Sequence, residues 1–559
     1  MAKIGKNLIE MLLFSMYPDP KIIYREYVQN AFDAITKAVE NKILGQTKDG
    51  LIDISISGTK RNIIIRDNGC GVSRDDISVL LDIANSTKDG ISSAGVYGIG
   101  RLVGAGYCEK LIFRTSAVGE NTKTIITLDS EQARKIIADK SNTSAANEVI
   151  DVISTKTSEP CPVDEHFFEV ELSNVLAAYS SDLLNEDNVI EYLKDVAPID
   201  YSTVFKKAII APSIEKQQDY SDFYKDIPFV TISVNDNSDI RKRYGLKVEG
   251  TAGKIGGEDD RILNLQFFTL EDKKYGILAK GWFAVTKFSV AINESNRSRG
   301  IRLRMHNIQI GNAQYLDSYH KEKRGNTYFY GEIHTINENL KPTTDRSALA
   351  PTEEAKALEK LIKDQFISLY HLYSTANKAK SKVSDIHTKV SNVAAATQEY
   401  DVDSDVNIIT KNLSELEKIV QTGDKAPKSA LTIVIDAYKD SAEEDLKSNP
   451  DVADKVAIQK RKIEQQSDSA QDGNSPTDQP KPYPIVDPEQ TLLRDNSSNT
   501  PSRSITDIFA PLKDKYSTEE VKLIRKCYLY FSKYCPAQEK KDMMGVWAAA
   551  IKELEKDVR

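Results

Sequence analysis

Cysteine and histidine are scarce in this chain, and neither is arranged for metal binding. The 559 residues include five cysteines and six histidines. The odd number of cysteines and the lack of any C-x-x-C pair argue against a disulfide framework and a zinc site, and no H-E-x-x-H motif occurs. This use of cysteine fits a reducing compartment. The cysteines are Cys70, Cys108, Cys161, Cys527 and Cys535.

Long apolar runs and an excess of basic charge are also missing. The apolar stretch at residues 8–16 is interrupted by Glu10 and is far shorter than the ~20 residues that cross a bilayer. It has no signal-peptide cleavage pattern. The formal net charge of −8 argues against a protein that coats nucleic acid. We therefore expect a cytoplasmic protein with no membrane partner, for which nucleic acid is not the favoured partner.

The length predicts about three or four domains, and 40% hydrophobic residues can form a sizeable core. Residues 1–175 have the densest patterns. They predict helices at 4–16 and 21–40, and strands at 51–58, 62–66 and 111–115, the first marked by the alternation of Ile52, Ile54 and Ile56. This predicts an α+β domain with its helices gathered on one side of a mixed, largely antiparallel sheet.

Four further segments are expected. Residues 176–375 predict an α/β middle domain, with strands at 229–234, 262–269, 275–285 and 301–308 and a helix at 353–373. Residues 376–465 predict polar helices without a clear heptad. Residues 466–504, rich in Ser, Asp, Asn, Gln and Pro, predict a flexible linker. Residues 505–559 predict a small helical module that docks a partner, with a capping box at Ser517 and Glu520 and a helix start at Pro536.

The helix at 21–40 carries Glu26, Asn30 and Asp33 at spacings of four and three, which place them on one helical face. The amide oxygen of Asn30 is suited to Mg²⁺, a cation that prefers oxygen ligands. Glu26 can then orient and deprotonate a water. Taken alone, such a row is more often a solvated polar face.

A second motif, Asp67-Asn68-Gly69-Cys70-Gly71, follows the apolar run at 63–65. An aspartate at a strand end can accept a hydrogen bond from an exocyclic amine such as that of adenine. Glycines let the backbone approach a flat base. Taken alone, a hairpin turn is the commoner use of these residues.

A third motif is the glycine-rich segment Gly95-Val96-Tyr97-Gly98-Ile99-Gly100. Such loops expose successive backbone N–H groups, which favour phosphate. It is not a Walker A loop, because no Gly-Lys-Ser/Thr follows, and it is not placed in a dinucleotide-binding βαβ unit. In this order, the three motifs supply a metal ligand and base, a base reader and a phosphate loop, which is what ATP hydrolysis needs.

The order of these motifs resembles the GHKL, or Bergerat-fold, ATPase superfamily, which unites gyrase, heat-shock chaperones, histidine kinases and mismatch-repair ATPases. The pattern is most similar to the 90-kDa heat-shock chaperones. KIIYREYVQNAFDAI resembles their opening helices, and LLDIANSTKDG with GVYGIGRLVGAGYCEKLIFRTS resembles their lid and phosphate loop. The resemblance implies a Bergerat-fold ATP-binding domain at 1–175, with ATP and Mg²⁺ as cofactors.

The resemblance also implies roles for single residues. Glu26 would be the general base and Asn30 the Mg²⁺ ligand. Asp67 would read the adenine amine, with Gly71 beneath the ring and Thr115 supporting Asp67. Asp33 would act through water or would cap local packing, and both alternatives stay open. The residues implied to wrap the phosphates are Gly95, Gly98 and Gly100.

RGIRLRMHNIQIGN and GEIHTINENLKPTTDRSAL resemble the middle domain of the same chaperones. That domain supplies an arginine to the γ-phosphate, which implies Arg346 here, acting by charge on the transferring phosphoryl group. Two alternatives stay open: Arg346 is a surface arginine after a turn, or Lys287 has the role, as a lysine does in gyrase-type enzymes. The resemblance covers residues ~5–375 and does not extend to the chaperones' dimerisation domain.

These features predict an ATPase that works as a conformational clamp on a protein client or partner subunits, with the lid at 84–95 closing over ATP. We expect a homodimer at least when ATP is bound. The alternative is an ATP-gated scaffold or DNA-associated protein with slow or no hydrolysis. A histidine kinase is disfavoured, since no helical phospho-acceptor domain precedes the site. Four basic residues would contact DNA in the alternative, unless they form a solvated strand face: Arg297, Arg299, Arg302 and Arg304.

Overall fold

The computed structural model describes residues 6, 10, 19–81, 100–238, 240–248, 260–343, 345–396, 401–423 and 425–471. The predicted helix at 4–16, except for two of its positions, and the predicted helical module at 505–559 lie outside these residues, as do Gly95 and Gly98. All of the described residues belong to one unit, Met1–Asp472. Helices and strands mix along this unit, which confirms the α+β class.

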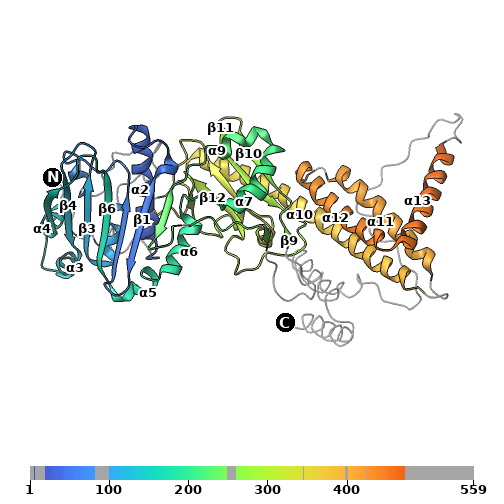
Figure 1. The fold of residues 1–559 in the computed structure, drawn as a ribbon, viewed down its shortest axis with the longest axis horizontal. Coiled ribbons are helices and arrows are strands. Elements are labelled where there is room, and N and C mark those ends of the chain that lie inside the picture. The colour runs from blue at the N-terminus through green and yellow to red at the C-terminus, as the bar shows by residue number, and fades with distance from the viewer. Residues whose placement is uncertain are drawn as a thin grey trace, which may run out of the picture. The chain divides into compact units, whose positions relative to one another are not determined.

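The first sheet has seven strands in the order β5-β4-β3-β6-β2-β1-β7 (Figure 1). Neighbouring strands are antiparallel except for β1 and β7, which are parallel. The strands are β1 (Leu51–Ser57), β2 (Asn62–Asp67), β3 (Cys108–Ser116), β4 (Thr122–Asp129), β5 (Ser154–Pro160), β6 (Phe167–Val175) and β7 (Thr231–Val234). The associated helices are α2 (Ile22–Glu40), α3 (Ser130–Ala138), α4 (Ala146–Ile153), α5 (Ser180–Leu183) and α6 (Glu186–Val196), with a 3-10 turn at Gly100–Gly106.

The register of this sheet separates an apolar face from a charged one. Ile54, Ile65, Val170, Phe113 and Ile126 are paired in one row across five strands, and all are buried. On the opposite face, Arg66 and Arg114 form ion pairs with Glu169, and Arg114 also pairs with Glu171. The apolar face packs against α2, α3 and α4. The helices therefore cover one side of the sheet, as predicted.

The first core extends beyond the expected boundary at residue 175. Leu193 of α6, Ile199 and Ile232 of β7 are buried in the same apolar cluster as α2 and the sheet. Strand β7 pairs directly with β1, so residues 231–234 return to the first sheet after the chain has passed along the second one. The sequence pattern did not predict that β7 pairs with β1.

The second sheet has five strands in the order β10-β11-β14-β12-β13. They are β10 (Asn264–Asp272), β11 (Gly276–Val285), β12 (Gly300–Met305), β13 (Ile308–Ile310) and β14 (Tyr330–Thr335). The expected single strand at 301–308 is in fact two, because His306 and Asn307 have positive φ values of 51° and 62° and reverse the chain. Around this sheet lie α7 (Thr203–Phe205), α8 (Ala211–Glu215), α9 (Ser221–Lys225) and the pair β8 (Lys247–Val248) and β9 (Asp260–Arg261).

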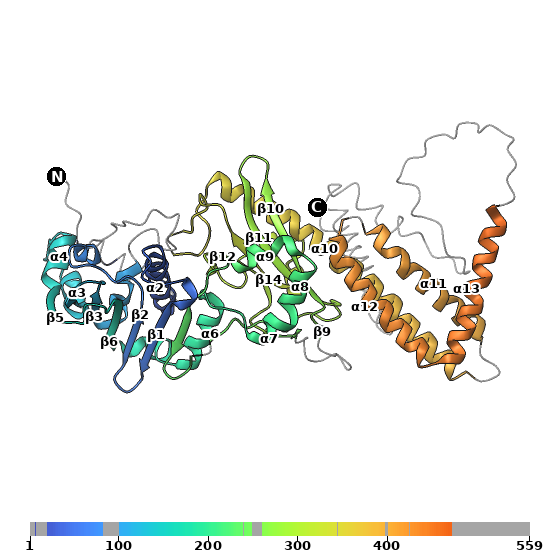
Figure 2. The ribbon, with the colours of Figure 1, turned by 45° about the horizontal axis from the view of Figure 1, so that its top comes forward.

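Helix α10 (Glu353–Ala394) is much longer than the predicted helix at 353–373. Its first half packs Leu358, Ile362 and Phe366 into the core of the second sheet. Its second half packs with α11 (Val402–Thr422), α12 (Lys428–Lys447) and α13 (Pro450–Gln471), which lie beside it in Figure 2. Helix α13 continues to Gln471, so the predicted first residue of the linker, 466, still lies within this helix.

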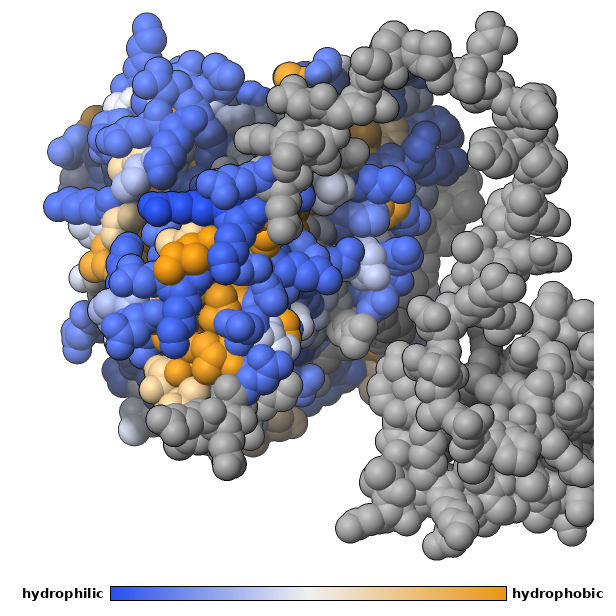
Figure 3. Space-filling model, turned by 90° about the vertical axis from the view of Figure 1, so that its right-hand side faces the viewer, coloured by the Kyte–Doolittle hydropathy of each residue, from blue (hydrophilic) through white to orange (hydrophobic). Residues whose placement is uncertain are grey.

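The surface at the α11–α13 end is mainly hydrophilic and is interrupted by hydrophobic side chains (Figure 3). The exposed large hydrophobic residues of the described part include Ile458 and Ile463 of α13. Among the described helices, none combines the length and the apolar run needed to cross a membrane.

Candidate functional site

The polar row on α2 is buried, so the solvated-face interpretation is wrong. Glu26 and Asp33 are each 6% exposed, and Asn30 is half-buried. The other sides of α2 place Ile23 and Ile35 in the core of the first sheet. A Cβ on Gly100 would lie 2.2 Å from Glu26 Oε2, so the 3-10 turn that begins at Gly100 packs directly on this carboxylate. Any larger residue at position 100 would displace Glu26.

Asp67 ends β2 and is 4% exposed. Its Oδ1 accepts a hydrogen bond from the Gly69 N–H at 2.8 Å. Burial raises the pKa of Asp67 to about 7, against the lowering effect of the Gly69 and Phe168 N–H groups and of the Arg66 charge. A buried carboxyl group that titrates near neutrality is typical of a functional site. The strand that follows along the chain, β3, does not pair with β2, so the segment after Asp67 is not a hairpin turn.

The glycines after Asp67 fix this segment against its surroundings. A Cβ on Gly69 would lie 2.7 Å from Ala34 of α2, and the Cys70 N–H donates to the Ala34 carbonyl at 3.2 Å. Gly71 has a φ of +65°, and its Cβ would lie 2.0 Å from the Ser116 carbonyl oxygen. Only glycine fits at position 71, for both the backbone angle and the space. The segment therefore joins α2 to the end of β3.

Thr115 lies in the same row of the sheet as Asp67, because both pair with Phe168 of β6. Its hydroxyl donates to the Phe167 carbonyl at 2.9 Å and accepts from the Val72 N–H at 2.8 Å. Thr115 thus holds the backbone just after Gly71. These two hydrogen bonds support the Asp67 segment through the backbone and not through the Asp67 carboxyl.

Arg346 is 2% exposed, so the surface-arginine alternative is wrong. Burial lowers the pKa of Arg346 to about 10, while the nearby Glu26 and Asp33 favour its charged form and Arg25 opposes it. Its backbone has a φ of 53° and is held by the Gly311 N–H, which donates to the Arg346 carbonyl at 2.8 Å. The neighbouring Asp345 carbonyl accepts from the Arg25 guanidinium at 2.6 Å. The segment after Pro342 is therefore docked on α2.

Lys287, the rival cation, is directed elsewhere. Its Nζ donates to the Ser441 hydroxyl of α12 at 2.6 Å and lies over the Tyr438 ring. Of the two candidates, Arg346 is the one that interacts with Glu26 and Asp33.

Two residues near this site escaped the sequence analysis. Arg25 precedes Glu26 and contacts the Arg346 segment. His306, on the turn between β12 and β13, has its pKa lowered by burial, with Asp33 and Arg346 acting on it in opposite directions. Nothing in the sequence marks His306, because its position depends on how the second sheet meets α2.

Of the four basic residues near β12, the two on the strand are buried, while Arg297 is exposed. Arg302 and Arg304 are 5% and 2% exposed, because both guanidinium groups turn into the protein. Arg297 pairs with Asp195 at 2.6 Å, and Arg299 with Glu294 at 3.5 Å.

Residues 20–159 match the family described as histidine kinase-, DNA gyrase B-, and HSP90-like ATPase. The chain is also similar to curated proteins named chaperone protein HtpG. The HtpG of Buchnera aphidicola subsp. Acyrthosiphon pisum is 27% identical over 245 residues, 40% of this chain and 38% of the relative. That of Clostridium acetobutylicum is 24% identical over 267 residues, and that of Halalkalibacterium halodurans 23% over 261 residues, each covering 40% of both chains.

These findings confirm the resemblance to GHKL ATPases and to the HSP90-type chaperones. The matches span about two fifths of the length of the relatives. An ATPase domain of this family supports ATP binding by residues 20–159.

Proposed function

We propose that this chain, whose residues 20–159 match the HSP90-like ATPase family, binds and hydrolyses ATP and works as a Mg²⁺-dependent, chaperone-like conformational clamp. The observation that carries this proposal is the burial of Arg346 beside Glu26 and Asp33. Arg346 follows the second sheet in the chain, whereas the two carboxylates belong to α2. The site is thus assembled from two parts of the fold, as a clamp requires.

The chemistry of the described residues fits a nucleotide. Asp67 is a buried acceptor whose pKa of about 7 reflects few stabilising donors. The backbone has no room for a side chain at Gly71, where one would meet the Ser116 carbonyl, or at Gly100, where one would meet Glu26. Asn30 lies one helical turn from Glu26, where an amide oxygen can complete the shell of a cation. Mg²⁺, bound with the nucleotide, would neutralise charge on the phosphates.

Each residue then has a role. Glu26 acts as the general base on water, and Asn30 holds Mg²⁺. Asp67 accepts from the adenine amine, in the segment held by Gly71 and Thr115. Arg346 stabilises the negative charge that develops on the transferring phosphoryl group. We also propose Asp33 as a water-mediated contact, and the phosphate wrap by Gly95, Gly98 and Gly100.

The partner in this proposal is a protein client or a partner subunit, in a homodimer that forms at least with ATP bound, and the C-terminal helices offer its docking site. The curated relatives are named as chaperones, which supports this class of partner. The DNA-associated alternative loses its main support, because Arg302 and Arg304 are buried.

Steady-state phosphate release with ATP and Mg²⁺ tests the proposal. Glu26→Ala should lower turnover by about 10²–10⁴-fold, the usual contribution of a general base, with binding of a non-hydrolysable ATP analogue retained. Arg346→Ala should lower turnover by about 10³-fold or more. Glu40→Ala, an exposed glutamate at the end of the same helix, is the matched control and should keep full turnover.

Full turnover in Glu26→Ala would rule out the assigned base. Analogue binding without turnover in the wild type would move the assignment to the ATP-gated scaffold.

A further inference from the structure

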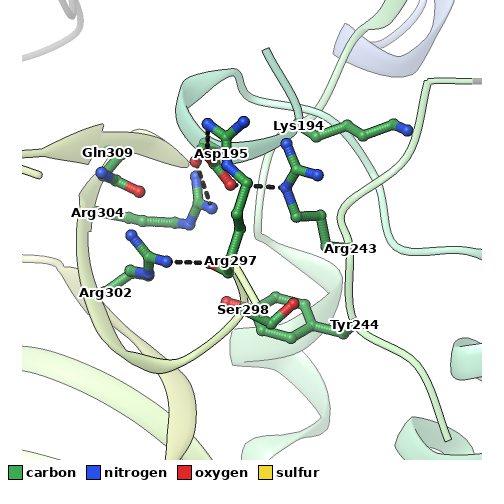
Figure 4. Close-up of a pocket in the computed structure, with 9 residues that line it drawn as sticks. All are labelled: Lys194, Asp195, Arg243, Tyr244, Arg297, Ser298, Arg302, Arg304 and Gln309. Atoms are coloured by element: carbon green, nitrogen blue, oxygen red, sulfur yellow. Dashed lines mark hydrogen bonds and ion pairs between the residues drawn. The ribbon is translucent and has the colours of Figure 1, made fainter. Parts of the chain in front are cut away.

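A pocket lined by arginines lies beside the second sheet, away from the α2 site. It is open to solvent. Figure 4 shows guanidinium groups that come from separate segments and gather around Asp195. Its lining residues are Lys194, Asp195, Arg243, Tyr244, Arg297, Ser298, Arg302, Arg304 and Gln309.

Two of these arginines have all three of their guanidinium nitrogens engaged. Arg243 donates to the Asp195 carboxylate at 2.8 Å and to the side chain and backbone carbonyl of Glu191. Arg304 donates to Glu332 at 2.5 Å and to the backbone carbonyls of Asn307 and Asp195, each at 3.0 Å. These two arginines are structural. They join α6 to the second sheet, and every nitrogen of the two guanidinium groups already donates to an acceptor of the protein.

Arg302 is different. It is 5% exposed, and its one hydrogen bond goes to the Arg297 backbone carbonyl. No carboxylate of the described residues forms an ion pair with it, although burial lowers the pKa of its guanidinium. Asp195 and Glu332 favour its charged form only through their charges, without an ion pair. A buried cation with no carboxylate in direct contact is stabilised by an anion that reaches it.

The surroundings of Arg302 share this shortage of negative charge. Five of the lining residues are basic and one, Asp195, is acidic. Glu191 pairs with Lys194 and Arg243, and Glu332 pairs with Arg304, but neither glutamate lines the pocket. The Ser298 side chain lines the same space and is 9% exposed.

We propose that this pocket binds a small phosphate-class oxyanion, held by the Arg302 guanidinium with Arg297 and the Ser298 hydroxyl as further donors. An arginine fork matches the oxygens of such an anion in a bidentate way. The Arg297 side chain is 48% exposed and therefore accessible from solvent. One of its nitrogens forms an ion pair with Asp195.

This site goes beyond the proposed ATPase function and does not require it. Asp195 and Lys194 come from α6, which packs in the first core, whereas Arg302 comes from β12 of the second sheet. An anion bound between them adds a link between the two parts of the fold.

The test is a calorimetric titration of the full chain with inorganic phosphate, at ionic strength held constant with NaCl. A saturating non-hydrolysable ATP analogue fills the α2 site, so that phosphate cannot bind there. The wild type should show saturable binding. Arg302→Gln should weaken binding by about 10–100-fold, as expected for the loss of hydrogen bonds from a charged group. Arg299→Gln is the control, since Arg299 pairs with Glu294 and does not line the pocket.

A second variant covers the case in which Arg302→Gln fails to fold. Ser298→Ala removes only a hydroxyl and should weaken phosphate binding several-fold with an unchanged circular dichroism spectrum. The proposal is overturned if the analogue-saturated wild type binds no phosphate. It is also overturned if Arg302→Gln, or in its place Ser298→Ala, binds phosphate as tightly as the wild type does.

Discussion

The first and second sheets each bury a carboxylate, and the pKa values of the two carboxylates are shifted in opposite directions. Asp67, at the end of β2, has its pKa raised to about 7 by burial. Burial alone would also raise the pKa of Glu332 on β14. The charges of Arg304 and Lys242 and the hydrogen bond from His334 hold it well below its usual range.

The difference lies in the partners that each carboxylate has. Glu332 is fully buried and accepts from Lys242 at 2.8 and 3.0 Å, from Arg304 at 2.5 Å and from the Tyr201 hydroxyl at 2.5 Å. Asp67 accepts from backbone N–H groups, with Arg66 acting only through its charge. A buried carboxylate surrounded by cations is part of the structure. One that lacks them is suited to receive a donor from a ligand.

The largest expected effect is on stability, at Glu332. Glu332→Gln would leave Lys242 and Arg304 buried without a carboxylate, and should lower the free energy of unfolding by about 3–5 kcal/mol. Urea unfolding measures this. Glu353→Gln removes an exposed partner of Lys356 and should cause no measurable loss. If Glu332→Gln and Glu353→Gln were equally stable, the structural role assigned to Glu332 would be wrong.

The next effect is on binding, at Asp67. Asp67→Asn should weaken ADP binding by about 10–100-fold, because the amide adds a donor that faces the adenine amine. Stability at pH 8 should not decrease, since the amide oxygen can still accept from the Gly69 N–H and no buried charge remains. Calorimetry and urea unfolding measure the two effects. A loss of stability as large as that of Glu332→Gln would show that Asp67 has a structural role, and the proposed difference between Asp67 and Glu332 would be wrong.

The pH dependence of binding sharpens the same comparison. Below the pKa of about 7 the Asp67 carboxyl is protonated, so ADP affinity should fall by up to about tenfold per pH unit. The effect of Asp67 on folding has the opposite sense. Its pKa in the folded state lies above the ordinary aspartate value of 3.8, so the stability that Asp67 contributes decreases as pH rises from about 4 to about 7. Calorimetry between pH 5.5 and pH 8.5 in the Asp67→Asn variant should give a flat profile, and a persisting slope would assign the titration to another group.

The smallest expected effect is at Lys287. Because its Nζ binds Ser441 of α12, Lys287→Gln should leave ATP turnover unchanged. Phosphate release measured beside Arg346→Ala separates the two candidate cations. A large loss in Lys287→Gln with normal turnover in Arg346→Ala would reverse their assignment.

Local patterns were sufficient where the fold follows local rules. The alternation of Ile52 and Ile54 predicted β1 and its buried face, and the register of the sheet places these residues in the core. The spacing of Glu26, Asn30 and Asp33 predicted one helical face correctly. It did not predict that this face is buried, since the covering segments around Gly100 and Arg346 come from distant parts of the chain.

Other errors have the same origin. Arg302 and Arg304 alternate on a strand, and sequence favours such residues on a solvated face. The structure buries both, because Glu332 and the carbonyls of Asp195, Arg297 and Asn307 accept from them. The return of β7 to the first sheet is equally a matter of long-range pairing with β1.

The sequence by itself predicted helix α2 and strands β1, β2 and β3, the α+β class and the motifs that resemble GHKL ATPases, because periodicity and glycine placement depend on neighbours along the chain. Only the tertiary structure decided which charges are buried, which cation meets Glu26 and where an arginine is left without a carboxylate. Burial and pairing depend on atoms far apart in sequence, and in a medium of low polarity they decide the charge state of each group.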